Sequence, residues 1–376
     1  MVFVFDFKNV NKAYPNILYK LKNEGEIVSP RGLKTLEFSE PCITILKNPE
    51  ENILTTIGRG GNIFFYIAEM LSILGGIPER EMIEYYNKNF SKYLDSPTDS
   101  YWHGFYGERI RHWGSYKGKK YYKNLPVIDQ LEKVYERLSK NLDSRQAIIN
   151  LFNPHLDLEE GHNDIPCNTQ LMFQNRKGKL NLYIINRSND INWGAYAVNL
   201  TWQFPTILKI MAGWLRLEVG KLYSFTKSLH LYLDNPITDG VLKYINSRVF
   251  DVYDYCKPLD CKMEKGEFDL VLKQIIYEEK CLRFGGERKL FLKNNWWNDI
   301  VTMLEVWSLR KNDKYLESLE KTFRLESYDM KISALEFQFR NSSKNPEMRD
   351  IIKKWVDFNQ LDYMNRIYIY GGIDYE

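Results

Sequence analysis

The stretch from Asp164 to Asn199 constrains the fold more than any other part of this chain. Residues 170–174 and residues 179–186 are rich in β-forming side chains. Between them, Arg176-Lys177-Gly178 is typical of a turn. This arrangement predicts a hairpin, and its adjacent antiparallel strands bring the start of the first strand and the end of the second to the same rim of a sheet.

Side chains that can take part in chemistry lie just before the first strand of that hairpin and just after the second. Cys167 comes just before the first strand, and Arg187, Ser188 and Asp190 follow the second. The hairpin therefore predicts one pocket that gathers a thiol, a cationic donor suited to phosphate and a carboxylate.

Composition narrows the class of protein. The 376 residues are 44% hydrophobic and 27% charged, which is enough for one large core or two domains. The net charge of +3 does not suggest a nucleic-acid partner. The five cysteines form no CxxC pair, so neither a disulfide framework nor a metal site is expected. The sequence shows no apolar run of membrane-spanning length and no signal segment, which favours a reduced cytoplasmic protein.

Strands and helices alternate through the first two thirds of the chain. Strands are predicted at residues 2–7 (an edge strand), from 36, at 42–46, 147–152 and 221–233. Helices are predicted at residues 9–22, 62–74, 78–92, 127–140 and 199–217. Further helices are predicted at residues 267–280, 296–310, 314–323 and 347–358, with no internal repeat.

The helix at 62–74 has the clearest signals. Asn62 is a suitable N-cap, and Gly75-Gly76 ends the helix. Glu69 lies among apolar residues on it, and a carboxylate there is costly to bury unless it is paired. The alternative is a solvent-facing glutamate on an amphipathic helix.

Five short motifs, in this order and spacing, resemble the thymidylate synthase family. They are Pro166-Cys167, Arg187-Ser188-x-Asp190, Gly194, Asn199 and His230-Leu231-Tyr232. The sequence from Arg187 to Tyr196 is most similar to the phage branch, which includes deoxyuridylate hydroxymethylases. The resemblance extends from about residue 24 to residue 235.

The resemblance implies an α/β (α+β) thymidylate synthase fold, with a mixed β-sheet packed against helices. It also implies a homodimer that forms sheet to sheet and shares its active sites. We expect residues 1–240 to form the catalytic core and residues 241–376 to form a mainly helical extension packed on it. A short apolar tail that closes over the folate is expected to be absent, because the chain ends in Gly371-Gly372-Ile373-Asp374-Tyr375-Glu376.

The resemblance implies four catalytic residues. Cys167 is the nucleophile that adds to carbon 6 of a pyrimidine, and nearby arginines (Arg187, Arg145) favour its thiolate. Glu69 organises the water that moves protons around the ring. Tyr106 belongs to a Tyr-Gly motif of the family. Asn199 reads the pyrimidine edge, since an amide is both donor and acceptor.

Substrate contacts follow from the same resemblance. Arg31, Arg187, Ser188 and the partner subunit's Arg145 would hold the nucleotide phosphate. The family has a second arginine where this chain has Gln146, so the pocket loses one charge. An exposed turn arginine is the alternative for Arg31.

The remaining contacts are to the sugar and the co-substrate. His230 and Tyr232 would bind the sugar hydroxyl. Asp190 and Gly194, with Arg59, would bind the co-substrate 5,10-methylenetetrahydrofolate. No metal and no membrane partner are expected, and a phage-encoded protein would act in the host cytoplasm.

The reaction after one-carbon transfer is less constrained. Water gives 5-hydroxymethyl-dUMP, the predicted product, whereas hydride transfer gives thymidylate and needs a dry site. Residues 89–93 replace a tryptophan-containing stretch of the family, Trp102 is displaced, and Asn168 replaces a histidine. True thymidylate synthase, a deoxycytidylate hydroxymethylase and an inactive nucleotide- or RNA-binding relative remain alternatives. Relative to thymidylate synthases, this chain also has one extra residue in the stretch that leads to Asn199.

Overall fold

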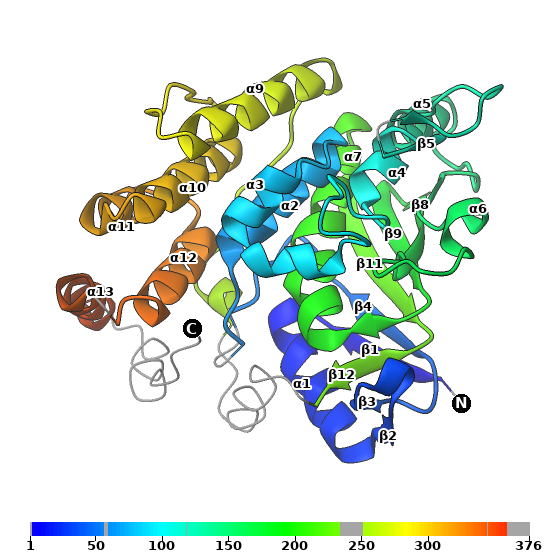
Figure 1. Cartoon of the computed structure of the whole chain (residues 1–376), viewed down its shortest axis with the longest axis horizontal. Helices are drawn as coiled ribbons and strands as arrows, with labels where there is room; N and C mark the ends of the chain where they lie inside the picture. Colours follow the sequence, from blue (N-terminus) through cyan, green and yellow to red (C-terminus); the bar gives the residue numbers. More distant parts are fainter. Residues whose placement is uncertain (1, 56–58, 118, 234–250, 344, 359–376) are drawn as a thin grey trace.

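A six-stranded mixed sheet forms the centre of the computed structural model (Figure 1), in which all residues except 1, 56–58, 118, 234–250, 344 and 359–376 are described. Its strand order is β1-β4-β11-β9-β8-β7. The strands are β1 (Phe3–Phe7), β4 (Cys42–Leu46), β11 (Glu218–Thr226), β9 (Lys179–Asn186), β8 (Asn168–Arg176) and β7 (Ile148–Asn150). β1 lies at the edge, as predicted.

The predicted hairpin is confirmed. β8 and β9 are antiparallel, and Asn168 pairs with Asn186 at the open end. At the closed end, Lys177 and Gly178 both adopt the left-handed conformation, with φ of 54° and 76°. The start of β8 and the end of β9 therefore share one rim of the sheet.

The two faces of the sheet differ in burial. Leu46, Leu222, Leu182 and Phe173 lie side by side across four strands and are buried under helices. On the opposite face a second row also runs in register. It consists of Ile45, Tyr223, Tyr183, Met172 and Ile148. In the single chain this apolar row is only partly covered.

A smaller four-stranded sheet, ordered β10-β12-β3-β2, lies beside the first. Its strands are β10 (Asn189–Asp190), β12 (Leu229–Tyr232), β3 (Thr35–Glu37) and β2 (Glu26–Val28). The prediction of one strand at 221–233 was wrong, because the chain leaves the large sheet after Thr226 and enters the small one at Leu229. Because β12 belongs to the small sheet, His230 lies opposite Asp190 of the neighbouring parallel strand β10.

The predicted helix at 199–217 was wrong in its start and its type. A π-helix, η3 (Ile191–Gln203), comes first, and α7 (Phe204–Trp214) continues from it. The N–H of Phe204 donates to the carbonyl of Asn199, five residues back. A π-turn holds more residues than an α-turn and is frequent at functional sites.

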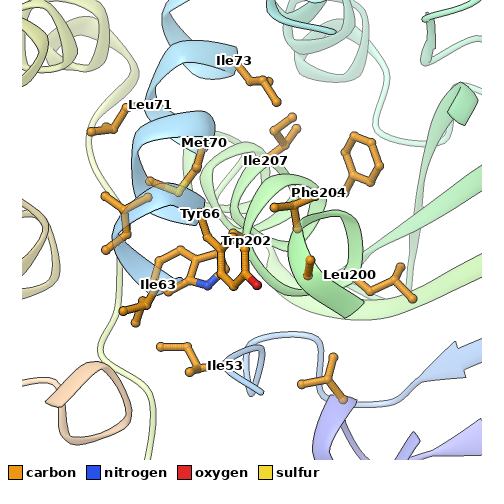
Figure 2. Close-up of a cluster of buried hydrophobic side chains, with 14 of the residues drawn as sticks. Ile53, Ile63, Tyr66, Met70, Leu71, Ile73, Leu200, Trp202, Phe204 and Ile207 are labelled. Atoms are coloured by element: carbon orange, nitrogen blue, oxygen red, sulfur yellow. The ribbon is translucent and has the colours of Figure 1, made fainter. Parts of the chain in front are cut away.

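Helix α2 (Ile63–Gly75) lies between the site and the C-terminal helices. As predicted, Asn62 caps it by accepting from the N–H of Phe65 at 3.1 Å, and Gly76 ends it with φ of 66°. Figure 2 shows Trp202 of η3 among the apolar side chains that join α2 to η3 and α7. Trp202 is 2% exposed, so this contact is core.

The remaining N-terminal elements cover the sheets or connect them. They are α1 (Val10–Glu24), η1 (Pro30–Gly32), α3 (Arg80–Tyr86), η2 (Lys88–Tyr93), α4 (Tyr106–Arg111), β5 (Ser115–Tyr116), β6 (Lys119–Lys120), α5 (Gln130–Lys140) and α6 (Pro154–Asp157). The single helix predicted at 78–92 divides into α3 and η2 because Asn87 takes an extended conformation. α5 begins later than predicted, where the Asp129 side chain caps it.

After β12 the described residues form helices. They are η4 (Val252–Asp254), α9 (Lys265–Arg283), α10 (Asn295–Lys311), α11 (Tyr315–Phe323), α12 (Tyr328–Arg340) and α13 (Pro346–Phe358). These helices lie beside α2 and α3, away from the large sheet (Figure 1), and α9, α10 and α12 contact α2. α12 was not predicted. The sequence 371–376, expected to lack a closing tail, lies outside the described residues. No helix in the described ranges is both long and apolar enough to span a membrane.

Candidate active site

Cys167 meets its predicted partners at the rim of the hairpin. Its Sγ lies 3.8 Å from Arg187 Nη2 and 3.8 Å from Ser188 Oγ. Arg187 is fixed by its own neighbours, because Nε donates to the carbonyl of Pro166 at 2.9 Å and Nη2 to that of Ile165 at 2.8 Å. The guanidinium is therefore held against the loop that carries the cysteine.

Burial raises the pKa of the Cys167 thiol. The charge of Arg187 and the hydrogen bond from Ser188 oppose this effect, while the charges of Asp164 and Asp190 add to it. Arg187 thus acts in the predicted direction, towards the thiolate, but burial outweighs it. Arg145 is not among the cysteine's partners.

Tyr106 and Asn168 anchor the residue after the cysteine. The Tyr106 hydroxyl donates to Asn168 Oδ1 at 2.8 Å and accepts from the Asn168 N–H at 3.2 Å. Asn168 Nδ2 donates to Asn186 Oδ1, and Asn186 Nδ2 donates to Ser224 Oγ at 2.8 Å. Asn168, which stands where the family has a histidine, is therefore part of a line of hydrogen bonds across β8, β9 and β11. It is fully buried.

Glu69 and Asn199 share one partner that the sequence did not indicate. Asn199 Nδ2 donates to Gln203 Oε1 at 2.8 Å, and the Gln203 side chain also hydrogen-bonds Glu69. Burial raises the pKa of Glu69 to about 8. The charge of Asp164 also raises this pKa, whereas the hydrogen bond from Gln203 lowers it. Glu69 is therefore largely protonated at neutral pH, and Gln203 fixes the orientation of the Asn199 amide.

Asp190 caps the first turn of η3. Its Oδ1 accepts from the N–H groups of Asn192 at 2.6 Å and Trp193 at 3.0 Å. These two bonds both use Oδ1, so Oδ2 can accept from a ligand. Burial raises the pKa of Asp190, and the charge of His230 acts against it. His230 and Tyr232 stand on the neighbouring strand with ring centroids 5.3 Å apart.

Gly194 and Arg59 lie close to the same turn. A Cβ at Gly194 would clash with Asn189 Oδ1 and lie 3.6 Å from Asn199 Oδ1, so any other residue there would have to displace the buried Asn189 side chain. Arg59 is 3% exposed and its Nη2 donates to the carbonyl of Asn192. Arg59 Nε has no hydrogen-bond partner among the described residues, which leaves one buried donor for a ligand.

The structure does not gather three of the predicted phosphate-binding residues around Cys167. Arg31 is exposed in η1 with φ of 55°, between the two strands β2 and β3. Arg145 and Gln146 are exposed ahead of β7, and Gln146 accepts from Arg137 Nη1. Their roles in binding phosphate stay predictions.

Two further polar side chains border the site and were missed. The charge of Asp164 acts on Cys167, Glu69 and Tyr106, and burial raises the pKa of Asp164 to about 6. Burial raises the pKa of Tyr93 to about 12, with contributions from the charges of Asp190, Asp164, Tyr232 and Cys167. Asp164 could have been noticed from its place three residues before the cysteine, whereas Tyr93 carries no local signal.

One group of potential metal donors lies in the described part of the chain. Donor atoms of Asp95, His103 and His162 lie within 4.8 Å of one another. Protein partners already use several of these atoms: His103 Nε2 lies 2.8 Å from Asp157 Oδ1, His103 Nδ1 2.9 Å from the Tyr116 hydroxyl, and His162 Nδ1 2.7 Å from Asp95. That the reaction needs no metal stays a prediction.

Comparison with known proteins defines the class. The sequence matches the thymidylate synthase family over residues 12–272, and the chain belongs to that family. It is 38% identical over 246 residues to a deoxyuridylate hydroxymethyltransferase of Bacillus phage SP01, covering 64% of this chain and 63% of the relative. It is 31% identical over 230 residues to a protein of the same name from Pseudomonas phage M6, covering 61% of each.

A third relative carries another name. The chain is 26% identical over 246 residues to a putative thymidylate synthase of Methanosarcina acetivorans, covering 64% of this chain and 94% of the relative. The aligned part of this chain thus spans less than two thirds of the length of the two phage relatives.

Proposed function

We propose that this protein transfers a one-carbon unit from methylenetetrahydrofolate to carbon 5 of dUMP and releases 5-hydroxymethyl-dUMP. One observation carries the proposal: Cys167 lies 3.8 Å from both Arg187 and Ser188. The charge of Asp164 links it to a buried network, because it acts on Cys167 and also on Glu69, which shares Gln203 with Asn199. The two phage relatives named deoxyuridylate hydroxymethyltransferase support the choice of product.

The residues suit the steps of this reaction. The Cys167 thiolate adds to carbon 6, and the resulting enolate makes carbon 5 nucleophilic. Phosphate bound by Arg187 and Ser188 would lower the barrier by positioning the ring, and Arg31 and the partner's Arg145 would add to that pocket. His230 and Tyr232 would hold the sugar. Glu69, protonated near neutral pH, can hold or release a proton at its carboxyl beside the ring.

Two groups near η3 fit the folate co-substrate, which supplies the one-carbon unit when bound. Asp190 Oδ2 can accept from N–H groups of the pterin ring. Arg59 is buried, and its Nε donor has no partner among the described residues, which suits a polar or anionic group. Gly194 lets this turn pack closely against Asn189.

Polar groups around the cysteine favour water over hydride as the final reactant. The Asp164 carboxyl and the Tyr93 hydroxyl both interact electrostatically with Cys167. Trp102 is 2% exposed and donates to the carbonyl of Phe90 at 3.1 Å, so it belongs to the interior. Thymidylate synthesis is the second candidate, because the archaeal relative carries that name.

We also propose that the protein is a homodimer joined through the half-exposed face of the large sheet. The row from Ile45 to Ile148 offers an apolar surface across five strands. Arg145 precedes β7 at the end of this row and is exposed, so it is available to the partner's phosphate site. We retain the division into a core of residues 1–240 and an extension of residues 241–376, supported by the helices that follow β12.

Product analysis tests the function. The purified protein is incubated with dUMP and methylenetetrahydrofolate, and the nucleotide is identified by mass. We expect the hydroxymethyl product, which carries one more oxygen than thymidylate, and no rise in near-ultraviolet absorbance from dihydrofolate. Cys167→Ala should lose turnover and still bind dUMP. Thymidylate as the main product would refute the hydroxymethylase assignment, and conversion of dCMP in place of dUMP would refute the base.

A further inference from the structure

The end of α12 lies directly against the segment from Arg59 to Gly61. Arg340 Nη2 donates to the carbonyl of Gly61 at 3.2 Å. Its guanidinium also packs on Gly60, where an added Cβ would stand 3.1 Å from Arg340 Cζ and closer still to Nη1. Gly60 has φ of 54° and no side chain, so it accommodates both the left-handed turn and the arginine.

The same face of α12 continues this contact. Ser333 and Glu336 line a crevice together with Arg59, Gly60 and Gly61. With Arg340 they follow a spacing of three and four residues, which places them on one face of the helix. The contact therefore involves a helix face and does not depend on one flexible side chain.

On its other side the segment reaches the candidate folate site. The Arg59 guanidinium donates to the carbonyl of Asn192 and lies 5.8 Å from the Trp193 ring centroid. The N–H groups of Asn192 and Trp193 are the two that Asp190 caps. An unbroken series of contacts thus joins Arg340 of the C-terminal helices to Asp190 at the start of η3.

We propose that Arg340 is a positioning residue for the folate-binding side of the active site. It holds the backbone of Gly60 and Gly61, and through them the direction of the Arg59 side chain. The inference rests on the proposed function, because it takes Arg59 and Asp190 to bind the co-substrate. It assigns to the C-terminal helices a part in the specificity of the core, beyond covering α2.

The test compares binding of the two substrates. Arg340→Ala should weaken binding of tetrahydrofolate to the enzyme–dUMP complex by about ten-fold, the size expected for one charge-assisted hydrogen bond. The Kd of dUMP alone should not change. The matched control is Arg349→Ala, which removes an arginine of α13 whose guanidinium carbon lies 4.6 Å from the Phe339 ring centroid. The control should bind both ligands like the wild type.

A double-mutant cycle separates positioning from general damage. Arg59→Met should weaken folate binding by itself, and adding Arg340→Ala should weaken it little further, because both changes act through one side chain. Arg340→Lys keeps the charge and should restore part of the affinity. Should Arg340→Ala fail to fold, the same cycle is run with Arg340→Lys.

The outcomes are distinct. Wild-type protein that binds no folate in the presence of dUMP would refute the proposed function. Wild-type protein that binds folate, together with an Arg340 variant that binds it equally well or with losses that add to those of Arg59→Met, would refute the positioning role.

Discussion

At the scale of single residues, the charge of Asp164 acts directly on Cys167. Its negative charge raises the pKa of Cys167. Asp164→Asn removes that charge, so we expect the thiol to ionise at lower pH. The pH dependence of alkylation of Cys167 by iodoacetamide measures this, with Glu159→Gln on the same loop as an exposed control. A thiol pKa that stays in place, or rises, would contradict the expectation.

Glu69 links the chemistry to stability. Its folded pKa of about 8 lies above the ordinary value of 4.5. The folded state therefore holds the proton more tightly than the unfolded state, and stability falls as pH rises between these two values. Glu69→Gln removes this loss. The free energy of unfolding of the variant minus that of wild type should therefore increase by about 2–3 kcal/mol when the pH is raised from 5.5 to 8.

Urea unfolding at the two pH values measures that gain. Glu84→Gln, which removes a partly exposed carboxylate that pairs with Arg80 at 2.7 Å, is the control. Equal pH dependence of wild type and Glu69→Gln would show that Glu69 titrates normally. Turnover of Glu69→Gln should be strongly reduced if the carboxyl moves protons beside the ring.

The sequence predicted some of these residues and not others, for a physical reason. Cys167 precedes the first strand of the hairpin, and Arg187 and Ser188 follow the second. Strand pairing alone therefore brings them together at its open end. Gln203 and Tyr93 reach the site through packing between elements that are distant in sequence, and no local pattern marks them. Arg31 and Arg145 came from family resemblance, and the single chain leaves both exposed.

At the scale of elements, η3 fixes the orientation of the Asn199 amide. The amide of Asn199 donates one N–H to Gln203, and among the described residues its Oδ1 and second N–H have no other hydrogen bond. If Asn199 reads the base as proposed, these two groups would contact the pyrimidine. Asn199→Asp replaces this donor with an acceptor. We expect activity on the uracil nucleotide to fall and activity on the cytosine nucleotide to rise, with a change in their ratio of roughly ten-fold or more.

Competition between dUMP and dCMP measures the ratio. Asn168→Asp provides a comparison, because Asn168 is fully buried and bonded to Tyr106, and it should lose activity without changing base preference. An unchanged ratio for Asn199→Asp would mean that another residue reads the base and that Asn199 does not contact it.

Elements with both a clear period and clear caps could be predicted. Asn62 and Gly76 mark the ends of α2, and the structure has the helix between them. The π-helix could not be predicted, since its sequence has the apolar character of an ordinary buried helix. α12 was missed because it is buried on several sides and includes polar residues such as Asp329, Glu336 and Gln338, which obscure its helical period.

At the scale of the whole molecule, a shared site makes a prediction about mixtures. If Arg145 serves the partner's phosphate, Arg145→Ala and Cys167→Ala should each be inactive alone. Random exchange gives about half heterodimers, each with one complete site, so the mixture should regain roughly one quarter of wild-type activity. Turnover is measured after subunit exchange is verified by mass. A mixture that remains inactive would show that Arg145 acts within its own chain.

The position of α2 also affects how the protein is made. One side of this helix carries Glu69, and the other is covered by residues far along the chain, including Trp307 and Phe337, whose ring centroids lie 5.2 and 5.3 Å from that of Phe64. During synthesis the ribosome releases α2 long before α10 and α12. The nascent chain therefore carries an uncovered apolar surface on α2, where chaperones can bind. A prematurely terminated product would keep that surface exposed and be open to proteolysis, so only chains synthesised through α12 would persist as enzyme.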